Sequence, residues 1–385
     1  MNRLASISAT DIVPKLIGKP YAFAAWRMPQ STERMLIVSL NKAEQTSSPI
    51  SELSPGFLIN RFADNHPAKP YHIKADLLFR SDELKISTEV SGQQIDDFLK
   101  VIEKPNDSQT PSNKVITASQ SSPSDSFENM VVQAVEKIKQ GAFEKIVLAR
   151  HQDIHLPENF LPVAFFDRIC SNYPNAFCNM VYVPGEGIWV GATPELLLSD
   201  NKERFKTVAL AGTKVLQPGQ SLTEIAWTQK EIEEQAFVCR YIINCFKKIR
   251  LREYVEKGPK TFQAGNLAHL KTEYVVDYAE VNYENLADQL LNLLNPTSAV
   301  CGMPLEETQQ FIEQYEPFDR SFYAGFLGPV NVDGSTDLFV NLRCMQVTGN
   351  RVRFYAGAGI TEDSNPASEL NETVLKMSVM KQFLD

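Results

Sequence analysis

Four stretches near the C-terminus decide the fold: EPFDRSFYAGFLGPVNV (residues 316–332), DLFVNLRCMQV (337–347), RVRFYAGAGI (351–360) and TEDSNPASELNETVLK (361–376). The second and third are rich in Val, Phe, Leu and Tyr and are separated by Thr-Gly-Asn. They therefore predict two β-strands, 338–347 and 351–360, joined by a turn. Asn365 can cap a helix and Pro366 suits its first position, which predicts a C-terminal helix.

Two faces of this helix differ in character. Helical spacing predicts a core stripe of Leu370, Val374, Met377, Met380 and Leu384. A different face carries Glu369, Glu372 and Lys376. Just before the helix, residues 357–359 (Gly-Ala-Gly) can expose backbone N–H groups to an anion where a strand ends. Carboxylates, a lysine and a donor-rich segment together indicate a site for a metal ion and an acidic substrate.

Length and composition set broad limits. The 385 residues, 43% apolar and 22% charged, are those of a soluble globular protein with a large core. A net charge of −9 without a Lys/Arg cluster argues against nucleic acid as a partner. Six scattered cysteines without a CxxC pair predict core thiols, not disulfides or a zinc site. We expect a cytoplasmic protein with no membrane partner, because no signal core and no apolar run of about 20 residues is present. No amphipathic seam suggests obligate assembly, so we expect a monomer.

The chain divides into three parts. Residues 1–103 carry mixed strand signals (35–40, 56–62 and 71–79) without candidate catalytic residues. Residues 104–125 are rich in Ser, Pro, Thr and Asn, which predicts a flexible loop. Residues 126–385 carry the candidate site. We expect one structural domain overall, because the first part shows few signs of folding alone.

A helix and a strand open the third part. Helical spacing of apolar residues from Phe127 to Ile138 predicts a helix that Gly141 ends. KIVLAR (145–150) follows as a strand. Lys145 is either a solvated lysine at the strand start or a side chain that points into the protein. His151 and His155 lie four apart, but in a strand and without a third ligand, which argues against a metal site.

Further carboxylates occur in apolar surroundings. GIWVGATPELLLS (187–199) predicts a strand, a Thr-Pro break and a second strand that carries Glu195. Glu195 is either the polar edge of that strand or a buried carboxyl whose raised pKa suits a proton donor. VALAGT (208–213) ends in a small-residue turn that a ligand can approach closely. In the next helix Glu234 heads one of two apolar stripes, so we expect it to be buried and to need a cation.

These segments together resemble the chorismate-utilising enzymes, which include isochorismate, salicylate, anthranilate and aminodeoxychorismate synthases. The resemblance covers residues 126–385, where the following motifs fall in family order: KIVLAR, GATPELLLS, LAGT, NPTSAVCG, EPFDRSFYAG, LRC, YAGAGI and ELNET. It implies the family's α+β fold, a large antiparallel two-layered β assembly wrapped by helices. Asn295 and Gln235 stand where many relatives carry His.

Three positions bear on the reaction that the resemblance implies. Relatives that use ammonia carry Gln at position 145, whereas Lys145 is typical of those that add water at C2 of chorismate. Aminodeoxychorismate synthases carry a nucleophilic lysine at the position of Ala211. Salicylate synthases tend to carry Thr where this chain has Ala299. The implied activity is that of an isochorismate synthase, an isomerase, whose product we expect to feed catechol siderophore synthesis. Salicylate synthase and the menaquinone pathway are the alternatives, and a non-catalytic relative is disfavoured by the intact acid, base and metal carboxylates.

The resemblance also implies roles within the site. Mg²⁺ would be bound by Glu234 and Glu372, with Glu369 acting through water. Lys145 would be the base that activates water and Glu195 the acid that protonates the leaving hydroxyl. The remaining implied residues bind or brace chorismate: Gly212, Thr213, His269, Ala299, Glu316, Arg343, Tyr355, Gly357, Ala358 and Lys376.

Overall fold

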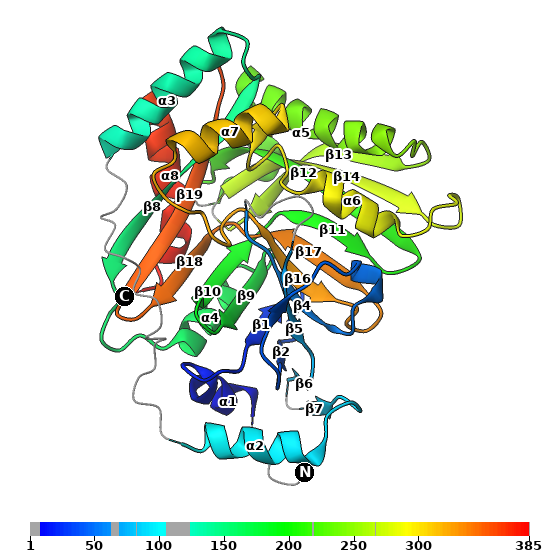
Figure 1. Cartoon of the computed structure of the whole chain (residues 1–385). Helices are drawn as coiled ribbons and strands as arrows, with labels where there is room; N and C mark the ends of the chain where they lie inside the picture. The colour runs from blue at the N-terminus through cyan, green and yellow to red at the C-terminus, as the bar shows by residue number, and fades with distance from the viewer. Residues whose placement is uncertain are drawn as a thin grey trace.

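The computed structural model describes residues 8–62, 69–81, 83–104, 124–217, 219–265 and 267–384. These residues form two large β-sheets with helices around them (Figure 1). Every strand pair in the described part of the chain is antiparallel. The expected α+β class, an antiparallel two-layered β assembly wrapped by helices, is confirmed.

The two sheets are called A and B here. Sheet A has ten strands in the order β15 (Gly302–Met303), β8 (Lys145–His155), β19 (Arg351–Ile360), β18 (Cys344–Thr348), β10 (Gly187–Thr193), β9 (Phe177–Val183), β1 (Phe23–Arg27), β2 (Met35–Val38), β6 (Leu77–Arg80) and β7 (Glu83–Ile86). Sheet B has nine strands in the order β13 (Val255–Ala264), β14 (Leu267–Asp277), β12 (Arg204–Val215), β11 (Leu196–Asp200), β17 (Thr336–Val340), β16 (Phe326–Val330), β4 (Gly56–Ile59), β5 (Tyr71–Lys74) and β3 (Glu44–Gln45).

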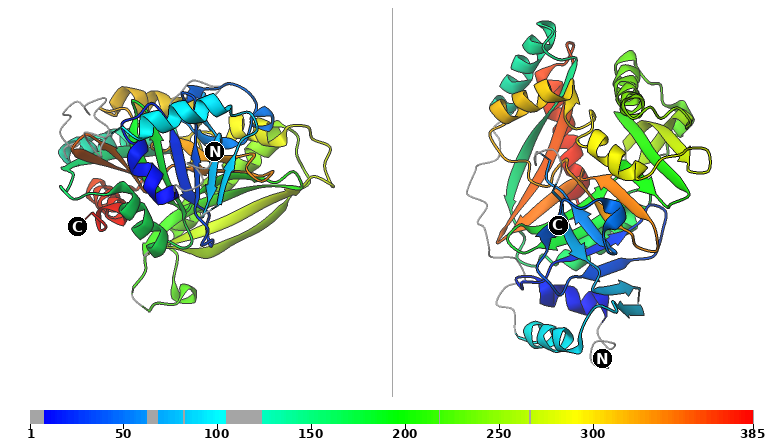
Figure 2. Two further views of the ribbon diagram at one scale, coloured as in Figure 1. Left: turned by 90° about the horizontal axis from the view of Figure 1, so that it is seen from below. Right: turned by 45° about the vertical axis from the view of Figure 1, so that its right-hand side comes forward.

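The helices are distributed over both sheets. They are α1 (Ala9–Leu16), α2 (Gly92–Ile102), α3 (Ser124–Lys139), α4 (Pro162–Asn172), α5 (Gln229–Lys248), α6 (Leu286–Leu294), α7 (Leu305–Tyr315) and α8 (Pro366–Lys381), with short 3₁₀ turns at Ile50–Glu52 and Leu222–Glu224. Helix α5 packs on β12 and β14 of sheet B, whereas α8 packs on β18 and β19 of sheet A. Figure 2 shows these two helices on opposite sides of the molecule's upper half.

Apolar side chains from the two sheets meet in one core. Phe177 of sheet A stacks on Phe339 of sheet B with ring centroids 4.1 Å apart, and the ring centroid of Phe57 of sheet B lies 6.4 Å from that of Phe177. A second core lies between sheet A and the helices α1, α2 and α4. Each fully buried aromatic or aliphatic side chain contributes roughly 1.5–3 kcal/mol, so these cores fix the relative position of the two sheets.

Two of the points at which the chain passes from one sheet to the other are neighbours in space. β10 of sheet A leads to β11 of sheet B through Pro194 and Glu195, and β17 of sheet B leads to β18 of sheet A through residues 341–343. The two crossings are hydrogen-bonded to each other, because Val340 N–H donates to the Glu195 carbonyl (2.9 Å) and Ala192 N–H donates to the Arg343 carbonyl (3.1 Å).

Two expected single strands are therefore wrong. Residues 338–347 form β17 and β18, which belong to different sheets, and the chain turns between them at Arg343 with a φ of 47°. Residues 71–79 likewise divide into β5 and β6 in different sheets. An apolar run looks continuous in the sequence whether it stays in one sheet or crosses to another.

In two helices, the buried face differs from the face that the sequence predicts to be buried. In α8, Met377, Met380 and Leu384 are buried as predicted, but Val374 is 53% exposed and Glu369 and Thr373 are buried in its place. In α5, the expected apolar stripe of Ile232, Ala236, Cys239, Ile243 and Phe246 is wrong at its start, because Ile232 is 47% exposed and Ala236 is exposed, whereas Phe246 is buried. The first turns of both helices border a polar cleft instead of an apolar core, which periodicity does not reveal. The Asn365 cap is confirmed, because its side chain accepts a hydrogen bond from Ser368 N–H. The helix α3, which ends before Gly141, is also confirmed.

Two glycine segments lie inside strands. Residues 357–359 lie near the end of β19, which ends at Ile360 as expected, and they are paired there with β8. Residues 208–213 lie within β12, where a bulge at Gly212 (φ 66°) replaces the expected turn. A positive φ at this position favours glycine.

Strands from the first hundred residues belong to both sheets. The predicted loop at 104–125 lies, for residues 105–123, outside the described part of the chain.

All six cysteines are free. Among the described residues, none of the helices combines the length and apolar character that a membrane crossing requires.

A buried ion pair ties the walls of the cleft together. Arg320, 3% exposed, is paired with Glu316 and donates to the carbonyls of Val147 (2.8 Å) and Val300 (2.9 Å). Glu316 in turn accepts a hydrogen bond from the N–H of Ala149 (2.7 Å). Glu316 thus braces β8 from behind and does not line the pocket.

Replacing Arg320 should destabilise the fold strongly. Arg320→Met leaves the Glu316 carboxylate buried without its cation, which should lower the free energy of unfolding by about 3 kcal/mol or more. Arg204→Met is the matched control, because Arg204 pairs with Asp277 at 3.5 Å on the surface, and it should cost less than about 1 kcal/mol. Urea unfolding followed by circular dichroism measures both, and equal losses would contradict the bracing role.

Candidate active site

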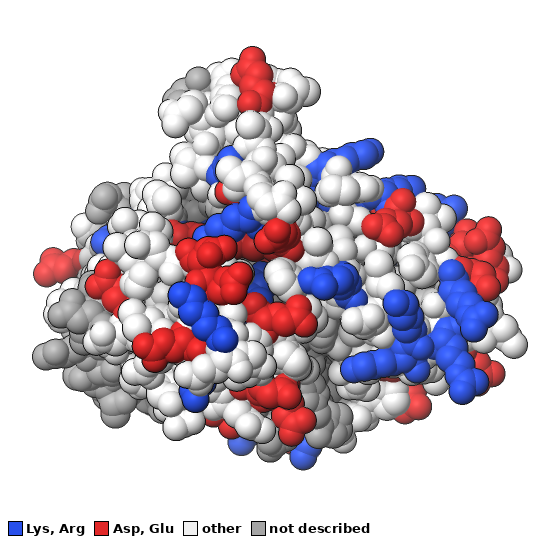
Figure 3. Space-filling view, turned by 90° about the horizontal axis from the view of Figure 1, so that it is seen from above, with Lys and Arg blue, Asp and Glu red and all other residues white. Residues whose placement is uncertain are grey.

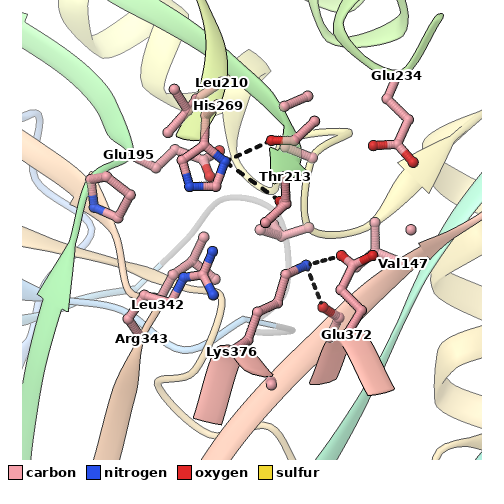
Figure 4. Close-up of a pocket in the computed structure, with 18 of the residues that line it drawn as sticks. Val147, Glu195, Leu210, Thr213, Glu234, His269, Leu342, Arg343, Glu372 and Lys376 are labelled. Atoms are coloured by element: carbon pink, nitrogen blue, oxygen red, sulfur yellow. Dashed lines mark hydrogen bonds and ion pairs between the residues drawn. The ribbon is translucent and has the colours of Figure 1, made fainter. Parts of the chain in front are cut away.

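A pocket lies where the two sheets diverge beside the chain crossings (Figure 4). It combines side chains from β8, β12, β14, β19, α5 and α8 with the two crossing segments. The lining residues are Lys145, Val147, Pro194, Glu195, Leu210, Ala211, Gly212, Thr213, Glu234, His269, Ala299, Val300, Tyr323, Leu342, Arg343, Tyr355, Ala356, Gly357, Gly359, Glu372 and Lys376.

Lys145 points into this pocket from the first position of β8. Its side chain is buried (4% exposed), so the solvated alternative is wrong. Burial lowers the pKa of Lys145 despite the nearby carboxylate of Glu234. Space for the lysine comes from Gly359 on the neighbouring strand, where a Cβ would lie 3.0 Å from Lys145 Cε.

Glu195 lies in the crossing between β10 and β11, just before the strand on which the sequence placed it. Its N–H donates to Thr193 Oγ1 (3.3 Å), and its carbonyl is held by Val340. The side chain is 6% exposed. Burial raises the pKa of Glu195 to about 7, although Lys145 and Arg343 act in the opposite direction. The buried-carboxyl alternative is therefore the correct one.

Two carboxylates lie at the end of the pocket opposite Glu195. Glu234 from α5 and Glu372 from α8 reach it from opposite sides (Figure 4). Burial raises the pKa of Glu234, and the neighbouring Glu372 raises it further. Burial alone would also raise the pKa of Glu372, but Lys376 and Lys230 outweigh this effect and lower it. The expected burial of Glu234 is met in part, because the residue is half-buried.

Two lysines balance this acidic end. Lys376 Nζ lies 2.5 Å from Glu372 Oε1 and donates to the Gly357 carbonyl (2.8 Å). Lys230 Nζ lies 2.9 Å from Glu369 Oε1. Glu369 therefore pairs with Lys230 and does not line the pocket.

Arg343 and His269 form the other polar wall. Arg343 Nη1 is buried without a hydrogen-bond partner in the described residues. His269 Nδ1–H donates to the Gly212 carbonyl (2.6 Å), which leaves Nε2 as a buried acceptor without a partner there. Burial lowers the pKa of His269 to about 3, so the ring is neutral at physiological pH. An unpaired donor and an unpaired acceptor in one wall suit a ligand that carries both an anionic group and a hydroxyl.

The bulge of β12 shapes the floor between these groups. Thr213 Oγ1 lies 3.5 Å from His269 Nδ1. A Cβ on Gly212 would lie 3.1 Å from the Cβ of Glu231 and 3.3 Å from the Trp227 ring, so α5 can approach only a glycine here.

Most of the predicted site residues are brought together, with three exceptions: Glu316, Glu369 and Ala358. Ala358 is fully buried, whereas its neighbours Gly357 and Gly359 border the pocket. Sequence reasoning missed Val147, Pro194, Leu210, Val300, Tyr323, Leu342 and Ala356. Alternation along β8 could have indicated Val147, because it shares a face with Lys145.

The two positions that depart from the family pattern lie behind the pocket. Gln235 is 3% exposed and donates to the Ala209 carbonyl (3.2 Å) and to Thr272 Oγ1 (3.0 Å), which ties α5 to sheet B. Asn295 is buried. His151 is buried and pairs with Asp153, and His155 is exposed.

The carboxylates of Glu234 and Glu372 at the acidic end of the pocket are ligands that suit a hard dication. No hydrogen bond or ion pair from the described residues reaches the Glu234 carboxylate, which is the arrangement expected of a metal ligand. The described residues bring together no group of three His, Cys, Asp or Glu side chains with metal-binding geometry. Two carboxylates are nevertheless enough for Mg²⁺, which usually takes its other ligands from waters and substrate oxygens.

The family model described as "Chorismate binding enzyme" matches residues 53–385. The match begins earlier than residue 126, where the sequence motifs begin, and covers about half of the first part of the chain.

Curated relatives and solved structures agree with this match. The chain is 31% identical over 259 residues to isochorismate synthase EntC of Escherichia coli, and the alignment covers 66% of each chain. It is 30% identical over 269 residues to the salicylate biosynthesis isochorismate synthase of Pseudomonas aeruginosa, covering 67% of this chain and 54% of that protein. The crystal structure of MenF, the menaquinone-specific isochorismate synthase of Escherichia coli, superposes with a TM-score of 0.78 at 23% identity, covering 98% of this chain and 92% of that one.

Proposed function

Because this chain belongs to the family of chorismate binding enzymes, we propose that it is an isochorismate synthase. The proposed reaction adds water at C2 of chorismate and removes the C4 hydroxyl, so the product is an isomer of the substrate. The names of the aligned relatives support this activity. The alignments span two thirds of those relatives or less, so the activity of this chain is a proposal.

One observation carries the proposal. Lys145 and Glu195 line the same pocket, and burial shifts their pKa values in opposite directions. Burial makes the lysine easier to deprotonate than a lysine in water, and the glutamic acid keeps its proton up to about pH 7. A reaction that takes a proton from water and gives one to a leaving hydroxyl needs this pair of states.

The proton-transfer steps follow from these states. Lys145 Nζ accepts a proton from the water that attacks C2. The ring double bonds shift as the new C2–O bond forms and the C4–O bond breaks. Glu195 gives its proton to the departing hydroxyl, which leaves as water. One water enters and one leaves, and the roles of the two residues exchange in the reverse direction.

Other residues hold the substrate for these steps. Arg343 and Lys376 are cations that bind its carboxylates, and an arginine can do so with two parallel hydrogen bonds. His269 Nε2 accepts a hydrogen bond from a ring hydroxyl. Glu234 and Glu372 hold Mg²⁺, with Glu369 further away. When bound, the metal supplies positive charge that orients a substrate carboxylate and draws electron density from the ring.

Two small residues favour isochorismate over other products. Ala211 and Ala299 both line the pocket. Neither can act as the nucleophile or polar group that the resemblance associates with aminodeoxychorismate or salicylate formation. The pocket is the same whichever enzyme consumes isochorismate. The assignment to 2,3-dihydroxybenzoate and catechol siderophore synthesis therefore stays our proposal from the sequence.

The function is tested by the products. Purified protein incubated with chorismate and Mg²⁺ should form isochorismate, identified by chromatography, without pyruvate and without an aminated product when ammonium is supplied. Removal of Mg²⁺ by a chelator should stop the reaction. Steady release of pyruvate with salicylate would assign the chain to the salicylate synthases instead.

The base and the acid are tested by substitution and pH. Lys145→Ala and Glu195→Gln should each lower kcat in both directions by about 10²-fold or more, the usual effect of losing a positioned proton-transfer group. Lys257→Ala, an exposed lysine on β13, is the control and should leave kcat unchanged. The wild-type rate should fall as pH rises through about 7, because Glu195 then loses the proton it donates. Normal turnover by Lys145→Ala would place the base elsewhere.

A further inference from the structure

Lys230 is a cation that the proposed mechanism does not use, and its side chain is 43% exposed. It lies in the first turn of α5 and does not line the pocket. Its ammonium group lies 2.9 Å from Glu369 Oε1 of α8, and the Glu369 side chain is only 2% exposed. In the described structure this is the one hydrogen-bonded ion pair between α5 and α8, which otherwise pack on different sheets.

Helical spacing places this ion pair beside the two metal-binding candidates. Lys230 and Glu234 are four residues apart on α5, so they share a face one turn apart. Glu369 and Glu372 are three residues apart on α8 and share a face in the same way. The pair Lys230–Glu369 therefore spans the same gap between the helices as Glu234 and Glu372.

The charges at this end of the pocket are nearly balanced without a metal. Three carboxylates, Glu234, Glu369 and Glu372, face the two ammonium groups of Lys230 and Lys376. Burial would lower the pKa of Lys230, but these carboxylates outweigh it and raise the pKa, so the lysine stays charged. Figure 3 shows acidic side chains gathered near the middle of the face seen from above, with basic side chains among them.

We propose that Lys230 is the internal counter-cation of the metal site, an inference that rests on the proposed Mg²⁺ binding by Glu234 and Glu372. One net negative charge attracts a dication only weakly, because the charge of Lys230 opposes that of Mg²⁺ at the same end of the pocket. A substrate with two carboxylates supplies the missing negative charge. Lys230 thus weakens binding of Mg²⁺ alone and makes metal binding depend on the substrate.

A purely structural bridge predicts the opposite sign. If Lys230 only held α5 and α8 together, its removal would loosen the spacing of Glu234 and Glu372. Mg²⁺ would then bind more weakly or unchanged. As a counter-cation, its removal strengthens Mg²⁺ binding.

The experiment is calorimetric titration of the full chain with magnesium chloride in the absence of substrate. Lys230→Met, which keeps the length and removes the charge, should bind Mg²⁺ about tenfold more tightly than wild type. Lys230→Arg keeps the charge and should match wild type. Arg240→Met is the matched control on the same helix, because Arg240 lies 3.9 Å from the exposed Glu144 outside the pocket, and it should also match wild type.

A second titration tests the dependence on substrate. The Glu195→Gln background keeps this position uncharged and suppresses turnover, so chorismate can be present at saturation. Chorismate should strengthen Mg²⁺ binding more in Glu195→Gln than in Glu195→Gln/Lys230→Met. An equal effect of chorismate in both would overturn the proposal.

Two further variants separate the possible failures. Glu234→Gln and Glu372→Gln should weaken Mg²⁺ binding, and if neither does, the proposed metal site itself is wrong. If both do and Lys230→Met binds Mg²⁺ no more tightly than wild type, only the role of Lys230 is overturned. Should Lys230→Met fail to fold, Glu369→Gln/Lys230→Met is compared with Glu369→Gln, and the double variant should bind Mg²⁺ more tightly.

Discussion

Burial of ionisable side chains between two β-sheets is the constraint on which this pocket depends. A charged group that leaves water loses hydration, which favours its neutral form unless an opposite charge is in contact. Lys145 and Glu195 have no ion-pair partner within contact in the described residues, and burial lowers the pKa of Lys145 and raises that of Glu195 to about 7. Glu372 and Glu369, by contrast, touch lysines. The same cleft thus favours the neutral forms of Lys145 and Glu195 at one place and holds a compensated charge cluster at another.

The path of the chain explains how such different groups meet. Glu195 and Arg343 lie at neighbouring points where the backbone leaves one sheet for the other, and hydrogen bonds between the two crossings fix their relation. Lys145 comes from sheet A, His269 from sheet B, and the Glu316–Arg320 pair braces the strand behind Lys145. A site built on strands and supported by buried ion pairs is held more precisely than one built on loops.

Much of this arrangement could be predicted from the sequence, because local signals are strong where a segment has one role. Such local signals predict the Asn365 cap, the helix α3 and the strand that begins at Lys145. Residues 338–347 looked like one strand, since an apolar run does not reveal that Arg343 turns from one sheet into the other. The apolar pattern predicts Val374 in the core, but Val374 is exposed because this part of the helix borders a polar cleft. The resemblance implies that Glu369 acts at the metal, but its ion pair depends on Lys230, which lies 139 residues from Glu369 in the sequence.

The central claim is that a neutral Lys145 activates a solvent water for attack on the ring. The most direct measurement is the reaction of chorismate in water enriched in the heavy isotope of oxygen, with the product analysed by mass spectrometry at early times. The account predicts one heavy oxygen in each isochorismate molecule, at the C2 hydroxyl. Unlabelled isochorismate would mean that the hydroxyl moves within the substrate, which would contradict the role of Lys145 as the base.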